Sequence, residues 1–352
     1  MNWENNITKQ LNIKYPVIQA PMLGVSTPEM AAAVSNESGL GSIAVGGLSP
    51  AATAELIRKT KQLTDKPFAV NLFAHAVSNY ENAAIEPMKQ FLLGLAEKRG
   101  YQITEEDLTN FHFYEYQDQI DILIQEKIPV VSFTFGTLDK ETIHLLKENG
   151  SILIGTATCL EEALILESLN IDMITLQGIE AGGHRGTFIE NKPLPQIGLF
   201  SLLPQVIKEI KIPVIAAGGI NNPQSIKAAF DLGAGAVQIG TAFIAGKESE
   251  AIPSYQQKLH TVKDTDIILT RAFSGRWARG IHNEFIQAIE SSCIDIPPYP
   301  IQNSLTSKFR KLAQQANDSE YTNLWAGQSA NSIEMKSSAE IFLGLVHPFK
   351  SK

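Results

Sequence analysis

Eight short apolar runs, each followed by a stretch of helical length, constrain the fold of this chain more than any other feature. Most of the runs are continuously apolar and β-branched, as are strands buried on both faces of a parallel sheet. They occupy residues 16–22, 40–46, 68–73, 130–135, 151–156, 173–177, 213–217 and 236–240. Between them, Thr27-Pro28, Ser49-Pro50 and Asn222-Pro223 combine a capping side chain with a proline, which marks a helix start. Eight βα units, spaced by roughly 20–27 residues in most cases, favour a TIM (β/α)₈ barrel over an open sheet.

Two intervals between the runs are too long for one helix. Residues 74–127 are polar and aromatic-rich, with a helical pattern at 86–99, and residues 178–198 form a glycine-rich loop. Both follow the carboxyl end of a strand, the face where barrel active sites form. We therefore predict an α/β fold in which residues 1–73 and 128–246 form the barrel. Residues 74–127 and 247–352 are expected to form a smaller, mainly helical second domain that covers this face.

Composition limits the classes of function. The chain has 352 residues, of which 44% are hydrophobic and 19% charged, so a disordered or fibrous protein is excluded. The net charge of −8 argues against nucleic-acid binding. Cys159 and Cys293 lie in no ligand cluster, so neither a disulfide framework nor a zinc site is expected. The polar residues 1–10 do not form a signal peptide, and no run approaches the ~20 apolar residues of a membrane span, so a cytoplasmic protein is expected.

Glycines at the ends of the last two predicted strands indicate a phosphate site. Gly218-Gly219 follow the seventh run and Gly240-Thr241 follow the eighth. Small residues allow a phosphate to approach backbone N–H groups, and barrels often bind phosphate after strands seven and eight. Either pair alone is better explained as a tight turn. Both pairs together favour phosphate binding, by a phosphosugar, a nucleotide or FMN.

Two amides favour FMN among these ligands. Asn71 and Gln177 end strands three and six, and an isoalloxazine edge presents N–H and C=O groups that amide side chains can match. Pro21 and Met22 could pack on the ring. The alternative for each amide is that it binds loop backbone, which is the commoner role of a single buried amide.

His184 is the strongest catalytic candidate. It lies in the segment AGGHRG at a strand end, and imidazole is the usual general base near neutral pH. The remaining histidines are weaker candidates: His75 and His112 in the insertion, His144 on a helix, His282 as an intermediate case, and His260 and His347 near the C-terminus. Glu180 could be a metal ligand or an acid, but no partner carboxylate is nearby, so a role in the loop backbone or in a salt bridge is the better explanation. No GxSxG, HExxH, dinucleotide or Walker motif occurs.

Several segments in order resemble the nitronate monooxygenase family, formerly called 2-nitropropane dioxygenases, of the bacterial FMN-dependent type. They are YPVIQAPM, TPEMAAAVSNESGLGSI, GIEAGGHRG, PVIAAGGI, VQIGTAF and, near the C-terminus, RAFSGRWARG, YPIQN and WAGQS. The resemblance implies a metal-free FMN enzyme that oxidises alkyl nitronates, with propionate 3-nitronate as the expected substrate, by O₂. The products would be a carbonyl compound and nitrite or related nitrogen oxides, formed through a flavin semiquinone.

The resemblance also implies roles for individual residues. His184 matches the active-site histidine, and Tyr299 is a candidate substrate contact. Positions that match FMN contacts are Asn71, Gln177, Gly182, Gly219, Gln238, Ile239, Gly240 and Thr241. The insertion 74–127 has no segment that aligns with the family, and the oligomeric state, a homodimer included, stays open.

Three other functions are compatible with parts of the sequence. An FMN-dependent enoyl-[acyl-carrier-protein] reductase has a similar Gly-Gly-His loop, but it needs a basic dock that this acidic chain lacks. An NAD(P)H:quinone reductase on the same scaffold has similar weight. A non-enzymatic flavin-binding protein is disfavoured by the intact His184 loop.

Overall fold

The computed structural model describes residues 3–75, 82–109, 111–190, 192–330 and 335–349. Eight parallel strands hydrogen-bond in the order β1-β9-β8-β6-β5-β4-β3-β2, and a bridge between Ile18 and Leu40 joins β1 to the segment just before β2. The sheet therefore closes into the predicted (β/α)₈ barrel. The strands are β1 (Val17–Gln19), β2 (Gly41–Ala44), β3 (Phe68–Phe73), β4 (Val130–Thr134), β5 (Ile152–Ala157), β6 (Met173–Gln177), β8 (Val214–Ala217) and β9 (Ala236–Ile239). All eight predicted strands are confirmed, most of them shorter at one or both ends.

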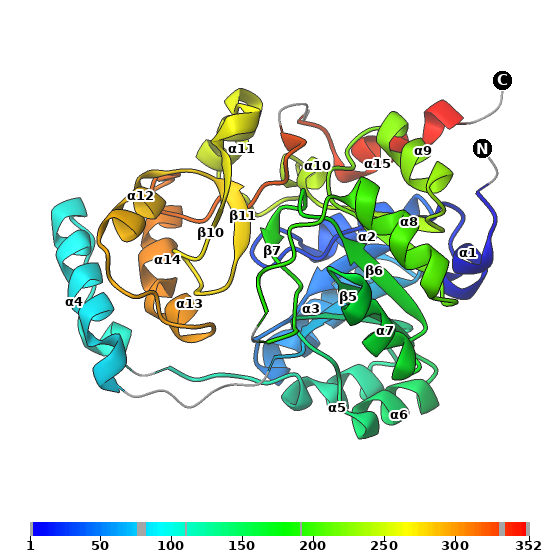
Figure 1. Ribbon diagram of the computed structural model, residues 1–352, viewed down its shortest axis with the longest axis horizontal. Coiled ribbons are helices and arrows are strands. Elements are labelled where there is room, and N and C mark those ends of the chain that lie inside the picture. Colours follow the sequence, from blue (N-terminus) through cyan, green and yellow to red (C-terminus); the bar gives the residue numbers. More distant parts are fainter. Residues whose placement is uncertain (1–2, 76–81, 110, 191, 331–334, 350–352) are drawn as a thin grey trace.

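Helices surround the barrel (Figure 1). They are α2 (Pro28–Asn36), α3 (Pro50–Leu63), α5 (Gln117–Gln125), α6 (Lys140–Glu148), α7 (Leu160–Ser168), α8 (Leu199–Glu209), α9 (Pro223–Asp231) and α15 (Ser338–Val346). The predicted caps form: the side chains of Thr27, Ser49 and Asn222 each accept a hydrogen bond from a backbone N–H in the first helical turn.

One end of the barrel is closed by the N-terminal helix α1 (Asn6–Leu11). Ile7 and Leu11 pack against residues at the amino ends of the strands, among them Ile18 and Met173. Asn5 caps α1 and donates a hydrogen bond from its amide to the backbone oxygen of Gly235, 2.7 Å away. Because this end is filled with apolar side chains, a ligand can enter only from the carboxyl ends of the strands.

A second domain with its own core lies beside the barrel (Figure 1). Its elements are α4 (Asn82–Arg99), η1 (Glu106–Leu108), α11 (Pro253–Thr261), η2 (Asp264–Asp266), β10 (Ile267–Thr270), β11 (Ala278–Ile281), α12 (Glu284–Ser291), α13 (Ile301–Leu305) and α14 (Ser307–Gln315). Apolar residues of α4, such as Met88 and Leu92, share a core with Phe273, Phe285 and Phe309. The insertion and the C-terminal extension thus fold together.

The arrangement differs from the expected division in two respects. Helices α5 and α15 pack into the barrel core, through Ile120 and Leu123 and through Phe342 and Val346. The second domain also contains a three-stranded sheet, β10-β11-β7, in which β7 (Gly183–His184) comes from the glycine-rich loop of the barrel. The loop that carries His184 is therefore a shared strand between the two domains.

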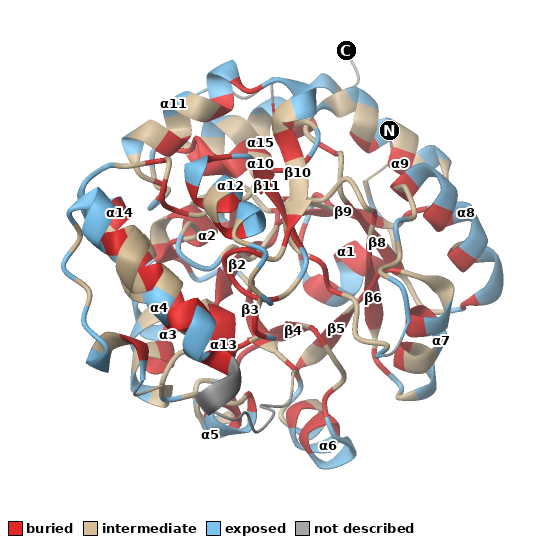
Figure 2. Ribbon diagram, turned by 60° about the vertical axis from the view of Figure 1, so that its left-hand side comes forward, coloured by how far each residue is buried: buried red, intermediate tan, exposed pale blue. Residues whose placement is uncertain are grey.

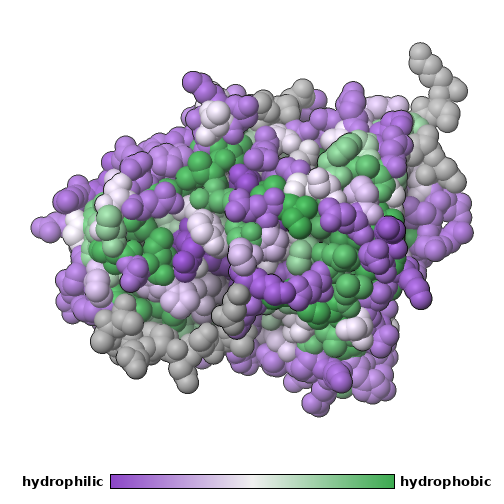
Figure 3. Space-filling model, viewed as in Figure 1, coloured by the Kyte–Doolittle hydropathy of each residue, from purple (hydrophilic) through white to green (hydrophobic). Residues whose placement is uncertain are grey.

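Burial follows this architecture. Buried residues concentrate on the strands and on the inward faces of the helices (Figure 2). The face in Figure 3 is mostly hydrophilic, with hydrophobic residues in smaller groups. Two short helices, α10 (Thr241–Ile244) and η4 (His347–Phe349), complete the elements. No helix within the described residues is long and apolar enough to cross a membrane.

Candidate active site

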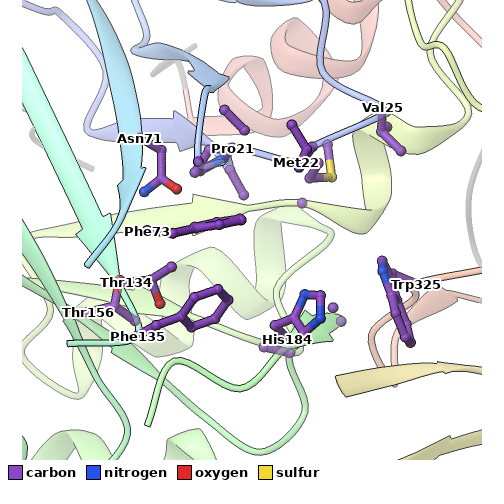
Figure 4. A pocket seen from close by; sticks show the side chains of 18 of the residues that line it. Pro21, Met22, Val25, Asn71, Phe73, Thr134, Phe135, Thr156, His184 and Trp325 are labelled. Atoms are coloured by element: carbon purple, nitrogen blue, oxygen red, sulfur yellow. The ribbon is translucent and has the colours of Figure 1, made fainter. Parts of the chain in front are cut away.

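A cavity of about 370 Å³ lies between the carboxyl ends of the barrel strands and the second domain. The ends of all eight barrel strands, or the segments that follow them, contribute to its wall, and the second domain contributes the opposite side. In the view of Figure 4, Pro21 and Met22 face His184 across the cavity, and the His184 imidazole lies between Phe135 and Trp325. The cavity is large enough for a cofactor or a drug-sized ligand.

The predicted phosphate segments meet at one side of this cavity. Gly218, Gly219, Gly240 and Thr241 all line it. Gly218 and Gly219 have φ values of +112° and +71°, which L side chains rarely adopt, so these positions require glycine. The N–H groups of Gly219 and Gly240 make no hydrogen bond to another described residue. Two neighbouring backbone donors are therefore free for an anion.

A segment of the C-terminal extension lies against these glycines. The backbone N–H of Gly327 donates to Thr241 Oγ1 at 3.0 Å, and Ser329 Oγ donates to the backbone oxygen of Gly219 at 2.8 Å. Gly182 fits against the same segment, because a Cβ there would lie 2.5 Å from the nitrogen of Gly327. Gly182 thus has a packing role beside its place in the cavity wall.

The two amides that favoured FMN have different surroundings. Asn71 lines the cavity and donates from Nδ2 to Ser132 Oγ at 2.9 Å. Gln177 also lines it, but its Nε2 donates to the backbone oxygen of His184 and its Oε1 accepts from Gly186 N, both at 2.9 Å. The Gln177 amide therefore binds loop backbone, the alternative considered for it, and holds the His184 loop in place.

Two further predicted contacts are constrained by the structure. Gln238 lines the cavity, whereas the side chain of Ile239 packs into the barrel core, so Ile239 can reach a ligand only through its backbone.

The carboxylate of Glu180 accepts hydrogen bonds from Leu199 N at the start of α8, at 2.9 and 3.0 Å. This is the loop role expected for Glu180. The described residues contain no group of three His, Cys, Asp or Glu side chains that could hold a metal.

His184 projects into the cavity from β7. Its Nε2 lies 2.8 Å from Ser274 Oγ, and Nδ1 makes no hydrogen bond to a described residue. The Ser274 hydroxyl donates to the backbone oxygen of Arg276 at 3.1 Å. Assigned from this network, Nε2 carries the proton and Nδ1 presents a lone pair to the cavity. The described geometry is that of a general base with a fixed tautomer.

Burial lowers the pKa of His184 to about 3, and the positive charges of Arg276 and Arg310 add to this effect. The pKa of His75 is lowered to about 4, again mainly by burial and then by Arg276. Both imidazoles are therefore neutral at pH 7, and the cavity carries a positive field from guanidinium groups. Such a field favours an anionic ligand.

Sequence reasoning missed several residues of the cavity wall. The sequence ranks His75 and His112 as weak candidates in the insertion, yet both line the cavity, and the rings of His75 and Tyr299 are 4.6 Å apart. Tyr299 was a candidate and lies 6.2 Å from the His184 ring. Arg310 and Trp325 come from distant parts of the chain, and no spacing signal connects them to His184.

Phe135 also belongs to this wall. It follows β4 with φ +76°, a strained conformation for a bulky residue that is maintained only where the surroundings enforce it. Its ring lies 4.6 Å from Phe73 and 5.6 Å from His184, and the guanidinium of Arg276 lies 4.3 Å above it. The strand-end rule that selected Asn71 and Gln177 would have found this residue too.

A barrel whose strand ends surround one cavity, with a neutral imidazole held by a second domain, defines the protein as an enzyme of the (β/α)₈ class. Comparisons with known proteins give its family. A nitronate monooxygenase family profile matches residues 4–347. The probable nitronate monooxygenase of Staphylococcus saprophyticus is 42% identical over 336 residues, covering 95% of this chain and 94% of that protein. That of Staphylococcus aureus is 42% identical over 327 residues, covering 93% and 92%. The chain belongs to the nitronate monooxygenase family, and nitronate oxidation is its class of reaction.

Solved structures agree with this placement. The chain is similar to nitroalkane oxidase from Streptomyces ansochromogenes, with a TM-score of 0.87, 35% identity and 97% of each chain covered. It is also similar to FabK from Thermotoga maritima, with a TM-score of 0.77, 30% identity and coverage of 99% of this chain and 96% of that one.

Proposed function

We propose that this enzyme binds FMN in the cavity and oxidises alkyl nitronates, propionate 3-nitronate among them, with O₂. The products are a carbonyl compound and nitrite or related nitrogen oxides. One observation carries the proposal: a single cavity joins free backbone donors at two glycine-rich strand ends to a neutral imidazole in a positive field.

The cavity fits FMN at both ends of that molecule. The N–H groups of Gly219 and Gly240 would bind the phosphate, since nothing in the described chain occupies them and a side chain at Gly219 would be strained by its φ of +71°. A Cβ at Gly240 would make ordinary van der Waals contact with Ala20 Cβ and Met22 Sδ, at 3.4 and 3.5 Å. Asn71 is placed to meet a polar ring edge, and Pro21 and Met22 present an apolar surface for the ring. Bound FMN supplies the electron acceptor, and the protein supplies binding and orientation.

The chain itself contributes charge and a base. The guanidinium groups near the cavity attract the anionic nitronate and stabilise it in a site shielded from bulk water. With a neutral nitroalkane, Nδ1 of His184 accepts the α-proton, and the nitronate formed beside it offsets the new imidazolium charge. Ser274 keeps the opposite ring nitrogen protonated, so the acceptor faces the substrate.

Two measurements test the proposal. Heat denaturation of the purified protein should release a non-covalent flavin that chromatography identifies as FMN. The native protein should consume O₂ and produce nitrite from propionate 3-nitronate. Release of FAD or no flavin would remove the cofactor assignment, and absence of nitronate-dependent O₂ uptake in FMN-loaded protein would remove the reaction. Faster NADPH-dependent reduction of crotonyl thioesters would favour the reductase alternative.

A further inference from the structure

Phe135 is the one aromatic residue within the described part of the chain that has a left-handed backbone, with φ +76°. The other six non-glycine residues with positive φ each lie within two positions after a helix, where a left-handed residue closes the last turn. They are Asn12, Ser38, Lys127, Asn170, Cys293 and Asn317. Phe135 instead follows strand β4, so helix termination does not account for its strained backbone, and strain of this kind clusters at functional sites.

Packing on several sides fixes the ring of Phe135 in the cavity wall. The ring of Phe73 lies 4.6 Å from it, and Phe73 in turn packs on Gly46, where a Cβ would lie 2.3 Å from the Phe73 ring. The guanidinium of Arg276 lies 4.3 Å above the Phe135 ring, and the Tyr299 ring is 5.7 Å away. Both of these side chains belong to the second domain. The Phe135 ring is therefore part of the second-domain side of the cavity, although its backbone follows a barrel strand.

Phe135 and Trp325 cover the two sides of the His184 imidazole (Figure 4). Their rings lie 5.6 and 5.4 Å from the His184 ring, and both line the cavity. The substrate carbon that reacts at Nδ1 of His184 is therefore flanked by two large rings. In a primary nitronate this carbon bears one hydrogen and one carbon chain, whereas in a secondary nitronate it bears two chains. A second chain would have to occupy space that one of the rings fills, and packed side chains leave little room for an extra methyl group.

We propose that Phe135 is a specificity-determining residue that limits the space beside the reacting carbon, so that the enzyme prefers primary nitronates to secondary nitronates. The proposal rests on the proposed function and adds to it a restriction on branching at the reacting carbon. It also gives the strained backbone a reason. Glycine at position 135 would adopt the same φ without strain, but it would leave the space beside His184 open.

The test compares propyl-1-nitronate with propyl-2-nitronate, two isomers of equal charge that differ only in the position of the nitronate carbon. Both are supplied as preformed anions, so removal of the α-proton does not enter the comparison. One methyl group in a tight apolar pocket changes kcat/KM by roughly 10–200-fold. Wild-type enzyme should therefore prefer propyl-1-nitronate by at least about 10-fold. Phe135→Ala should reduce this preference by about 10-fold, by raising kcat/KM for propyl-2-nitronate, while propyl-1-nitronate changes by less than about 3-fold.

Phe135→Gly provides the same space without backbone strain, so it decides the question if Phe135→Ala does not fold. Lys127→Gly is its matched control. Lys127 lies just before β4 with φ +47° and is not among the residues that line the cavity, so this variant relieves strain and should keep the wild-type preference.

Two results at full FMN content would overturn the proposal. One is an unchanged preference in Phe135→Gly, which would mean that the ring does not limit the substrate. The other is an equal loss on both isomers, which would give Phe135 a structural role only. If the wild type oxidises neither isomer, the proposed function fails instead.

Discussion

The two walls of the active-site cavity are built from different materials. The barrel wall presents backbone N–H groups, glycines and uncharged side chains such as Asn71. The second-domain wall presents large and charged side chains, among them Tyr299, Arg310 and Trp325. Backbone donors and neutral side chains suit a cofactor that fits closely against backbone, whereas the charged Arg310 and the phenol of Tyr299 suit discrimination among substrates. From this difference we propose that the barrel wall binds the FMN and that the second-domain wall selects the nitronate.

His184 lies at the junction of these walls. Its backbone oxygen accepts a hydrogen bond from Gln177 of the barrel, whereas its backbone pairs with Ala278 of β11 and its ring contacts Ser274. Residues of both domains therefore fix the position of this imidazole. His184 is therefore the residue at which the different roles proposed for the two walls are best tested.

The largest expected effect is on the barrel wall. Gly219→Val should yield protein with little or no FMN, because a β-branched residue at φ +71° distorts the segment that would hold the phosphate. Absorbance of the purified variant, with flavin quantified after denaturation, measures this. Gly150→Val is the matched control, because Gly150 has φ +83° and open space around it and is not among the residues that line the cavity. Full FMN content in Gly219→Val would place the phosphate elsewhere.

Replacing His184, which residues of both walls hold in place, should separate removal of the α-proton from oxidation of the nitronate. His184→Asn removes the base, so turnover of neutral nitroalkanes should fall by about 10²–10⁴-fold. A preformed nitronate has already lost its α-proton and should be affected less, with FMN content unchanged. Steady-state O₂ uptake with the neutral nitroalkane and with its nitronate measures how much turnover the variant loses on each. Equal losses on both would mean that His184 acts by position or charge, and no loss on either would leave it a structural residue.

A smaller effect is expected from replacing Ser274, the second-domain residue that hydrogen-bonds the His184 ring. Ser274→Ala frees the tautomer of His184 and should lower turnover of neutral nitroalkanes by about 10-fold, with little change on nitronates. Ser304→Ala is the control, since Ser304 also lines the cavity from the second domain but does not bond His184. Identical behaviour of the two variants would contradict a positioning role for Ser274.

The smallest effect concerns stability in acid. The pKa values of His184 and His75 are lowered to about 3 and about 4, from about 6.5 in the unfolded chain. Between these values the unfolded state binds protons that the folded state does not, so stability is full above pH 6.5 and falls below it. For each of the two imidazoles, the free energy of unfolding should fall by about 1–2 kcal/mol between pH 7 and pH 5.

Chemical denaturation at several pH values measures this dependence. His184→Asn should show a shallower loss in acid than the wild type. The matched control is His144→Asn, which replaces an exposed histidine outside the cavity lining. A wild-type slope equal to that of His184→Asn would contradict the neutral, buried state of the imidazole.

The barrel could be predicted from sequence because its information is local. Continuous apolar runs and capped helix starts such as Thr27-Pro28 specify strands and helices without reference to distant residues. The strand-end rule then selected Asn71, Gly219 and His184, since parallel strands bring their carboxyl ends to one face. The same rule does not tell whether a side chain at a strand end contacts a ligand or hydrogen-bonds the backbone of a loop. The Gln177 amide hydrogen-bonds the backbone of the His184 loop.

The second-domain wall could not be predicted in the same way. Ser274 and Arg310 reach His184 and its cavity through a sheet and a helix whose packing joins residues about 90 or more positions apart. His75 lies two residues after β3, inside the segment 74–127 that the sequence pattern assigns to the insertion. Long-range packing, and not local pattern, decides which side chains of an insertion face a cavity.

The most direct test of the central claim is an anaerobic titration of the purified, FMN-loaded protein. Propionate 3-nitronate should bleach the flavin absorbance near its visible maximum, and admission of O₂ should restore it with formation of nitrite. NADPH added in the same way should leave the spectrum unchanged. Bleaching by NADPH with no response to the nitronate would contradict the account and assign this cavity to a reductase.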